Sequence, residues 1–298
     1  LAIFMHLYVS DYSLAKVESQ IIMSIKNRIK RGISFLLHGE PKPTYAKISY
    51  LSPNHVLEGK KIIVTGGGRG LGYAMAERFV KEGASVLISG RKEETLKESA
   101  KKLGCKYLVL DVSKTDGFEE FMAEADKMLG GVNCLVNNAG VSLHESDYTR
   151  VTPESFDKQI ATNLKGGFFL TQKFIMLLKS RDEKGTILFT SSETGDTVDE
   201  RPYGWTKAAI NSMVQGLAYK LAKEGFRINA VAPGITASDM TGLKADGNIH
   251  FTGNIIDRVY MPEEVAETAT FLLSDASGCL NGQILVCNNG KTINARWK

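Results

Sequence analysis

Short apolar runs rich in β-branched residues alternate with helical patterns from Gly59 to the end of the chain. A short, continuous apolar run is typical of a strand that is buried on both faces of a sheet. Seven such runs predict strands, at residues 61–65, 84–89, 107–110, 132–136, 186–190, 227–231 and 283–287. The pattern therefore indicates a sheet whose strands are separated along the chain by longer segments.

Helical patterns occupy the segments between these strands. Thr152 is a favourable N-cap and Pro153 suits the first helical position, so one helix has a well-marked start. Helices are predicted near 70–81, 92–103, 115–129, 153–180, 203–224 and 262–274. Strands that alternate with helices predict a parallel sheet with helices on both faces. Right-handed crossovers make this an α/β, doubly wound Rossmann fold with a seven-stranded parallel sheet.

Residues 1–57 have a different texture. A basic, partly amphipathic stretch at 14–37 precedes Gly39-Glu40-Pro41-Lys42-Pro43, which would break a helix. The segment has too few apolar residues for a core of its own. We therefore expect a basic N-terminal extension, not an independent domain, followed by one domain at 58–298. Packing against a neighbouring subunit is favoured for the extension, with an acidic partner or an anionic membrane surface as alternatives.

The charge is concentrated in this extension. The chain has 37 Lys and Arg against 33 Asp and Glu, a net charge of +4. Residues 1–57 hold seven basic and three acidic residues, so residues 58–298 carry 30 of each. A neutral domain argues against nucleic-acid binding, because affinity for phosphates depends on clusters of Lys and Arg.

The cysteines and the hydropathy bear on location. Four scattered cysteines form no CxxC pair and have no metal-ligand spacing with the five histidines. We expect no disulfide framework, no metal site and a reducing, cytoplasmic environment. No apolar stretch approaches the ~20 residues of a membrane span, and the N-terminus lacks the features of a signal peptide.

A glycine-rich turn, Thr65-Gly-Gly-Gly-Arg-Gly-Leu-Gly72, joins the first predicted strand to a helix. Glycines allow a tight turn and a close approach of the backbone to a pyrophosphate, whose charge is met by the helix N-terminus. In this strand–turn–helix context the motif predicts a dinucleotide site. The residues expected to form it are Gly66, Gly68, Arg69, Gly70, Leu71 and Gly72.

The end of the second strand bears on the choice of cofactor. NAD sites of this type usually carry an acid there, on the ribose 2′-hydroxyl. Here the sequence is Ser89-Gly90-Arg91, without an acid. Arg91 and Arg69 could bind a 2′-phosphate through charged hydrogen bonds, which favours NADP(H) over NAD(H). The alternative is that both arginines are solvated.

Tyr203 and Lys207 lie four residues apart in a predicted helix, on one face. A tyrosine with a pKa near ~10 is a poor acid or base at neutral pH, but a neighbouring ammonium group stabilises its phenolate. Ser192 follows the fifth strand at the carboxyl edge of the sheet, where a cofactor crevice is expected. Its hydroxyl could hold a substrate carbonyl or merely cap the strand end.

The order of these segments resembles that of the short-chain dehydrogenase/reductase family, and within it 3-oxoacyl-[acyl-carrier-protein] reductases. The resemblance covers Gly59 to about Gly290 and excludes residues 1–57. It rests on Thr65–Gly72, Asp111-Val112, Asn137–Gly140, Asn163, Ser192, Tyr203, Lys207, Asn229–Gly234, Pro262–Val265 and Phe271–Asp275.

The resemblance implies an NAD(P)-dependent enzyme that interconverts a carbonyl and a secondary alcohol of a small molecule. Tyr203 would be the general acid or base, Lys207 would lower its pKa and bind the nicotinamide ribose, Ser192 would orient the substrate oxygen, and Asn163 would hold a water. The other implied cofactor contacts are Asp111, Val112, Asn138, Ala139, Gly140, Pro233, Gly234 and Thr236, with Ser238 as an additional candidate. A sugar or polyol dehydrogenase and a non-catalytic nucleotide-binding scaffold are alternatives. A homodimer or homotetramer formed through helices 153–180 and 203–224 is also implied.

Three segments depart from the family pattern. The loop between Ser192 and Tyr203 is shorter than usual and carries Glu193, Asp196, Asp199, Glu200 and Arg201. It is either a solvated charged loop or a sign of a polar or cationic substrate. Residues 241–260 contain too much glycine and asparagine for a continuous helix. Asn288-Asn289-Gly290 replaces the more usual Asp-Gly-Gly. His144, Tyr148, His250 and Phe251 are candidate substrate contacts, but ordinary surface or packing positions are favoured for each.

Overall fold

A computed structural model describes residues 43–46, 54–243 and 247–293. The chain divides into two compact units, Leu1–Thr44 and Tyr45–Lys298. All of the described helices and strands belong to the second unit. The expectations for the basic stretch at 14–37 concern residues that lie outside the described part of the chain.

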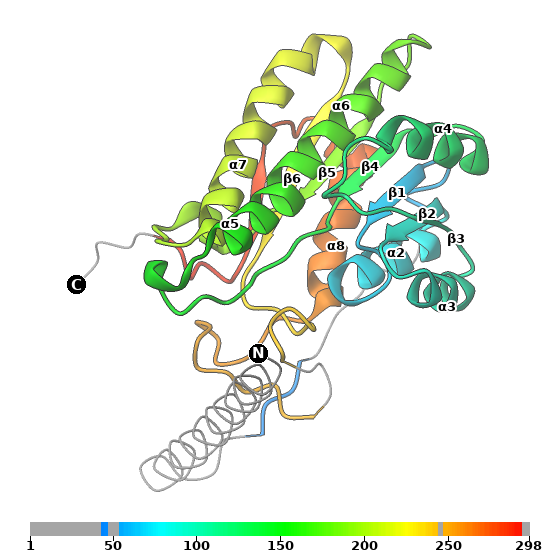
Figure 1. Cartoon of the computed structure of the whole chain (residues 1–298). Helices are drawn as coiled ribbons and strands as arrows, with labels where there is room; N and C mark the ends of the chain where they lie inside the picture. The colour runs from blue at the N-terminus through cyan, green and yellow to red at the C-terminus, as the bar shows by residue number, and fades with distance from the viewer. Residues whose placement is uncertain (1–42, 47–53, 244–246, 294–298) are drawn as a thin grey trace, which may run out of the picture. The chain divides into compact units, whose positions relative to one another are not determined.

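The second unit is built on one sheet of parallel strands (Figure 1). Its order is β3-β2-β1-β4-β5-β6-β7, so the direction of winding reverses between β1 and β4. The strands are β1 (Lys61–Thr65), β2 (Ser85–Gly90), β3 (Lys106–Val109), β4 (Cys134–Asn137), β5 (Thr186–Thr190), β6 (Arg227–Pro233) and β7 (Ile284–Cys287). This is the predicted doubly wound Rossmann fold. A ligand crevice is expected at the carboxyl edge near the point of reversal.

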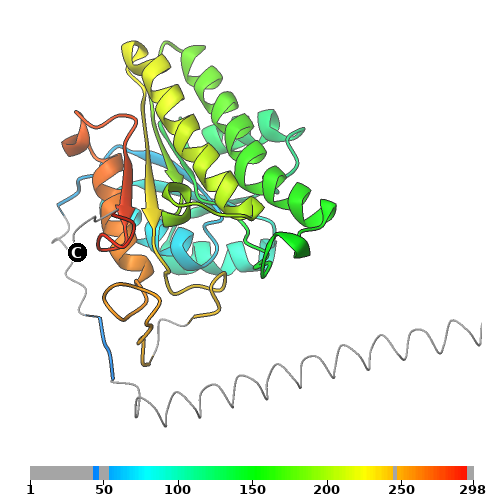
Figure 2. The same ribbon diagram turned by 90° about the vertical axis from the view of Figure 1, so that its left-hand side faces the viewer.

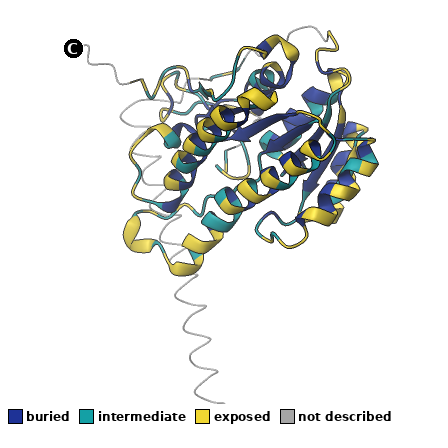
Figure 3. Ribbon diagram, turned by 90° about the horizontal axis from the view of Figure 1, so that it is seen from above, coloured by how far each residue is buried: buried dark blue, intermediate teal, exposed yellow. Residues whose placement is uncertain are grey.

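Helices cover both faces of the sheet (Figures 1 and 2). They are α2 (Gly70–Lys81), α3 (Glu93–Leu103), α4 (Phe118–Leu129), α5 (Pro153–Gln159), α6 (Gly166–Lys179), α7 (Pro202–Leu221) and α8 (Pro262–Leu273). One core lies between the sheet and α4, α6 and α7, and the other between the sheet and α2, α3 and α8. Neighbouring strand residues alternate between the two cores, as Ile62 and Ile63 do. The five central strands are consequently largely buried, the edge strands β3 and β7 are less so, and the outer helix faces are exposed (Figure 3).

The predicted helix at 153–180 is interrupted. It starts as expected, with Ser155 N–H donating to Thr152 Oγ1 at 3.2 Å in a capping box. Residues Ile160–Lys165 then form a π-helical turn between α5 and α6. At the end of this turn the backbone packs against another segment, because a Cβ on Gly166 would lie 2.1 Å from the carbonyl oxygen of Val112. Such turns are frequent at functional sites.

The residues just before β1 pack into this unit. Leu57 is fully buried in the core that contains α2. The backbone N–H groups of Asn54 and Val56 donate to Glu82 Oε2 at 3.2 and 3.1 Å. The second unit thus begins at Tyr45, and the boundary at 57/58 between the extension and the domain stays a prediction.

The segment after β6 contains no helix in its described residues up to Tyr260. Short backbone pairings hold it instead, between Ser238 and Leu243, His250 and Arg258, and Thr236 and Tyr260. The prediction that residues 241–260 do not form a continuous helix is therefore confirmed for 241–243 and 247–260. Across the described parts of the chain, no helix has the length and apolar character needed to cross a membrane.

Candidate active site

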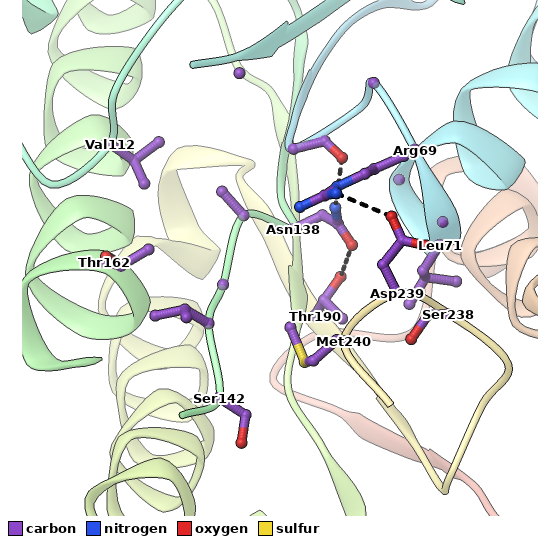
Figure 4. A pocket seen from close by; sticks show the side chains of 18 of the residues that line it. Arg69, Leu71, Val112, Asn138, Ser142, Thr162, Thr190, Ser238, Asp239 and Met240 are labelled. Carbon is purple, nitrogen blue, oxygen red and sulfur yellow. Dashed lines mark hydrogen bonds and ion pairs between the residues drawn. The ribbon is translucent and has the colours of Figure 1, made fainter. Parts of the chain in front are cut away.

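A cavity of about 530 Å³ lies at the carboxyl edge of the sheet (Figure 4). It is formed by the segments that follow β1, β2, β3, β4, β5 and β6. All the residues predicted to bind the cofactor line it: Gly66, Gly68, Arg69, Gly70, Leu71, Gly72, Arg91, Asp111, Val112, Asn138, Ala139, Gly140, Tyr203, Lys207, Pro233, Gly234 and Thr236. Ser192 lines it too, and Asn163 does not. The structure thus brings the predicted residues together, while their individual roles stay predictions.

The glycine turn has the shape of a cradle for a phosphate group. Gly66 has φ +65°, a conformation that other residues rarely adopt. A Cβ on Gly72 would lie 2.3 Å from the carbonyl oxygen of Gly66, so no side chain fits there. Arg69 N-caps α2 without a side-chain hydrogen bond to the helix. These backbone features, and a cavity lined by the ends of six strands, fit a dinucleotide whose pyrophosphate lies at the start of α2.

Hydrogen bonds tie together the strand ends beneath the cavity. Thr65 Oγ1 accepts the N–H groups of Asn138 at 3.0 Å and of Ala139 at 3.1 Å. The Asn138 side chain donates to Thr65 O at 3.0 Å. It also accepts from Thr190 Oγ1 at 3.2 Å (Figure 4). Asn138 therefore links β1, β4 and β5 at the point where the sheet reverses direction.

Two arginines and an aspartate line the end of the cavity near β2 and β3. Burial opposes ionisation of Asp111, but hydrogen bonds from Ser113 and the charge of Arg91 lower its pKa below the ordinary value. Arg91 is exposed and lines the cavity. Arg69 Nη1 lies 2.9 Å from Asp239 Oδ2, in an ion pair across the cavity (Figure 4). Of the two arginines proposed for a 2′-phosphate, Arg69 thus already has a carboxylate partner.

Tyr203, Lys207 and Ser192 form a compact group at the other end. Tyr203 lies in the first turn of α7, and Lys207 Nζ lies 5.6 Å from the centre of its ring. Burial raises the pKa of Tyr203 and a hydrogen bond with Ser192 opposes this shift. Burial lowers the pKa of Lys207 to about 8, and its Nζ donates to Thr190 O at 2.8 Å. At neutral pH the group therefore holds a protonated phenol beside a cation.

The Ser192 hydroxyl is free to donate. Its Oγ accepts the Thr194 N–H at 3.2 Å, which fixes its position and uses a lone pair. The O–H proton therefore stays available for Tyr203 or for a substrate oxygen.

Asn163 lies behind this group, in the π-helical turn. Its Oδ1 accepts the Val141 N–H at 2.8 Å, and its Nδ2 donates to Val141 O at 2.9 Å and to Thr206 Oγ1 at 3.2 Å. The side chain thus anchors the segment after β4 to α7, next to Lys207. It borders a small adjoining space and not the main cavity. Its implied role with a water stays a prediction.

The charged loop between Ser192 and α7 has exposed residues, among them Glu200, but three of its carboxylates bind protein groups. The Asp199 side chain is buried and pairs with Arg201 at 2.9 Å. Asp196 accepts a hydrogen bond from Asn211 at 3.0 Å. Glu193 is buried as well. These carboxylates bind groups of the protein itself, so the loop's charge is no longer a reason to expect a cationic substrate.

Sequence reasoning missed several residues of the cavity wall. Asp239 and Met240, which follow β6 and precede the 241–260 segment, line it, as do Lys158 and Thr162. Their only signal was proximity to the Pro233-Gly234 motif or to Asn163. Of the candidate substrate contacts, His144 has Nε2 2.5 Å from Met240 O. His144, Tyr148, His250 and Phe251 do not line the cavity.

A parallel doubly wound sheet with a phosphate-binding turn and a Ser–Tyr–Lys group defines a nicotinamide-dependent oxidoreductase. Residues 66–292 match the family model described as enoyl-(acyl carrier protein) reductase. The chain belongs to the short-chain dehydrogenase/reductase family and is an NAD(P)-dependent dehydrogenase/reductase, as the sequence motifs predicted.

Relatives that are named for different substrates are similar to this chain. The 3-oxoacyl-[acyl-carrier-protein] reductase FabG of Chlamydia muridarum is 33% identical over 80% of this chain and 99% of its own length. The NADP(+)-dependent L-rhamnose 1-dehydrogenase of Thermoplasma acidophilum is 31% identical over 80% and 98%. The structure of 3-ketoacyl-(acyl-carrier-protein) reductase from Brucella melitensis, complexed with NADH, superposes with a TM-score of 0.74 at 29% identity. It covers 80% of this chain and 100% of its own.

Proposed function

We propose that this protein interconverts a carbonyl compound and a secondary alcohol with NADP(H), in the manner of a 3-oxoacyl reductase. The observation that carries the proposal is the grouping of Ser192, Tyr203 and Lys207 at one end of the cavity. This group can hold a carbonyl oxygen and deliver a proton to it. A non-catalytic scaffold has no need of a buried lysine beside a tyrosine that faces the cavity.

The chemistry of the chain's own residues follows from the geometry. The nicotinamide cofactor supplies or accepts the hydride. Ser192 donates its O–H to the substrate oxygen, since the bond it accepts from Thr194 N–H leaves this proton free and its hydrogen bond with Tyr203 holds the two hydroxyls together. Tyr203 donates its proton to that oxygen as charge develops there, and takes it back in the oxidative direction. The charge of Lys207, 5.6 Å from the ring, and the N-terminus of α7 stabilise the phenolate that remains.

The preference for NADP(H) rests on Arg91. It lies on the cavity wall directly after β2, where an acid would repel a 2′-phosphate. Ser89 Oγ, at the end of β2, is buried and has no hydrogen-bond partner among the described residues. A titration of NADPH and NADH tests this proposal, with tighter NADPH binding expected. Equal dissociation constants would refute it.

A sugar or polyol dehydrogenase is the second candidate. The Thermoplasma relative named for L-rhamnose favours it. The charged loop gives no support to this candidate, because Glu193, Asp196 and Asp199 bind protein groups. NADPH consumption measured over 3-ketoacyl thioesters, ketosteroids, quinones and keto sugars separates the candidates. Turnover of the thioesters supports the first proposal. Tight NADPH binding without turnover of any carbonyl would support a scaffold.

We also propose a cytoplasmic homodimer or homotetramer that acts on small molecules, without nucleic acid as a partner. Exposed aromatic side chains on α6 and α7 support self-association, among them Phe168, Trp205 and Tyr219. The four cysteines are free, which fits a reducing environment. Light scattering of the purified full chain gives the number of subunits, and a monomer at micromolar concentration would refute the assembly.

A further inference from the structure

Three neighbouring strands end side by side near Ser192, and one buried carboxylate joins the segments that follow them. Glu193 comes directly after Ser192, beyond β5, and its side chain is 9% exposed. Its Oε2 accepts Asn288 Nδ2 at 3.1 Å, and its Oε1 accepts Lys291 Nζ at 2.7 Å. Asn288 and Lys291 both follow β7. The carboxylate thus ties the loop of Ser192 to the last described segment of the chain.

The segment after β6 packs against the same group. A Cβ on Gly234 would lie 3.1 Å from Glu193 Oε2 and 3.0 Å from Asn288 Cβ, so the side chains lie close against the Gly234 backbone. Tyr260 lies beside them, where burial and then the charge of Glu193 raise its pKa. Gly234 lines the cavity, whereas Glu193 does not. Glu193 therefore lies just outside the cavity wall.

The side chain of residue 288 is an amide, which can donate a hydrogen bond to the Glu193 carboxylate. Asn288 is 1% exposed, donates to Glu193 and also to Thr292 Oγ1 at 3.0 Å. An aspartate in its place would bury a second negative charge against Glu193. A buried ion pair adds little net stability, because desolvation offsets the attraction, and its best-supported use is to specify one arrangement.

That arrangement bears on the catalytic hydroxyl. Residues Ser192–Gly195 form one tight turn, in which Thr194 N–H donates to Ser192 Oγ and Gly195 N–H to Ser192 O at 2.9 Å. We propose that Glu193 is a positioning residue, which with Asn288 and Lys291 holds this turn so that the Ser192 hydroxyl faces Tyr203. The C-terminal segment is thereby part of the active-site support. This inference rests on the proposed function, because it uses the role of Ser192 in carbonyl reduction.

The first test removes the cation of the pair. K291M should lower kcat about tenfold, while the NADPH dissociation constant and the KM for the carbonyl change less than twofold. Asp126→Asn is the matched control, since Asp126 and Arg181 form a partly buried pair at 2.6 Å between α4 and the end of α6. D126N should lower the melting temperature without changing kcat. If K291M behaves like D126N, or loses NADPH binding, the proposal is overturned.

The second test exchanges donor and acceptor. N288D should lower kcat at least as much as K291M, because two carboxylates then face each other. The double variant E193Q/N288D places the amide on residue 193 and the carboxylate on residue 288, so the hydrogen bond between the two side chains can form again with its direction reversed. It should recover kcat to within about threefold of the wild type. A double variant no faster than N288D would overturn the proposal.

The two proposals fail in different ways. A wild-type protein that turns over none of the carbonyls in the panel contradicts the proposed function. An active wild type whose K291M and N288D variants keep their kcat contradicts only the role of Glu193.

Discussion

The buried lysine of the active site should make the stability of the folded protein rise with pH. Burial lowers the pKa of Lys207 to about 8 from the ordinary value of 10.5. Between these two values the unfolded chain binds more protons than the folded one, so raising the pH favours folding. Below pH 8 both states hold the proton, and the full cost of the buried charge remains. Replacing Lys207 with methionine removes this charge and keeps an unbranched side chain in its place.

The difference between the two pKa values sets the size of the effect. It corresponds to about 3 kcal/mol of unfolding free energy at pH 7. By pH 9.5 most folded molecules have released the proton, and the cost falls to about 1 kcal/mol. The wild type should therefore gain about 2 kcal/mol over this range relative to K207M. The hydrogen bond from Nζ to Thr190 O does not cancel this gain, because a neutral amine also donates.

Urea unfolding without cofactor at pH 7, 8, 9 and 9.5 measures the effect. The wild type is compared with K207M and with K220M, which removes an exposed lysine from the same helix. Titratable groups that the three proteins share contribute equally to the pH dependence of each, so their contributions cancel in the comparison. K220M should keep the pH dependence of the wild type, and K207M should lose it. Parallel curves for wild type and K207M would refute the assignment of a buried, weakly basic Lys207.

Three further changes test the cofactor site and the chemistry. Tyr203→Phe keeps the ring and removes the proton donor, so kcat should fall by at least about 100-fold while calorimetry shows NADPH binding unchanged within twofold. Arg91→Ala should weaken NADPH binding about tenfold or more and leave NADH nearly unaffected in a fluorescence titration; equal losses would contradict a 2′-phosphate contact. Gly72→Ala places a methyl group 2.3 Å from Gly66 O. It should raise the NADPH dissociation constant at least tenfold and lower the unfolding free energy by about 1–3 kcal/mol, and an unchanged dissociation constant would contradict the phosphate cradle.

Local patterns predicted most of the fold. The helix expected at 70–81 is α2, Gly70–Lys81, and the strand expected at 61–65 is β1. Both follow from periodicity and from glycine at the turn, which are properties of adjacent residues. The four-residue spacing of Tyr203 and Lys207 likewise placed them on one face of α7.

Contacts between distant segments account for what local patterns missed. The π-helical turn Ile160–Lys165 precedes the close approach of Gly166 to Val112, which periodicity does not encode. Glu193, in a run of charged residues, reads as exposed, yet its partners lie 95 and 98 residues further along the chain. Arg69 similarly meets Asp239, 170 residues away. Whether a charged side chain is buried depends on partners that are distant in the chain, so local composition does not predict its exposure.

The cavity draws its walls from strand ends that are far apart in the chain, from Gly66 after β1 to Thr236 after β6. A partly folded chain lacks part of the cavity wall, so only the completely folded domain should bind the cofactor tightly. Cofactor at 100 times its dissociation constant then adds about 2.7 kcal/mol to the unfolding free energy. The lifetime of this protein against proteolysis in the cell should accordingly follow the size of the nicotinamide pool.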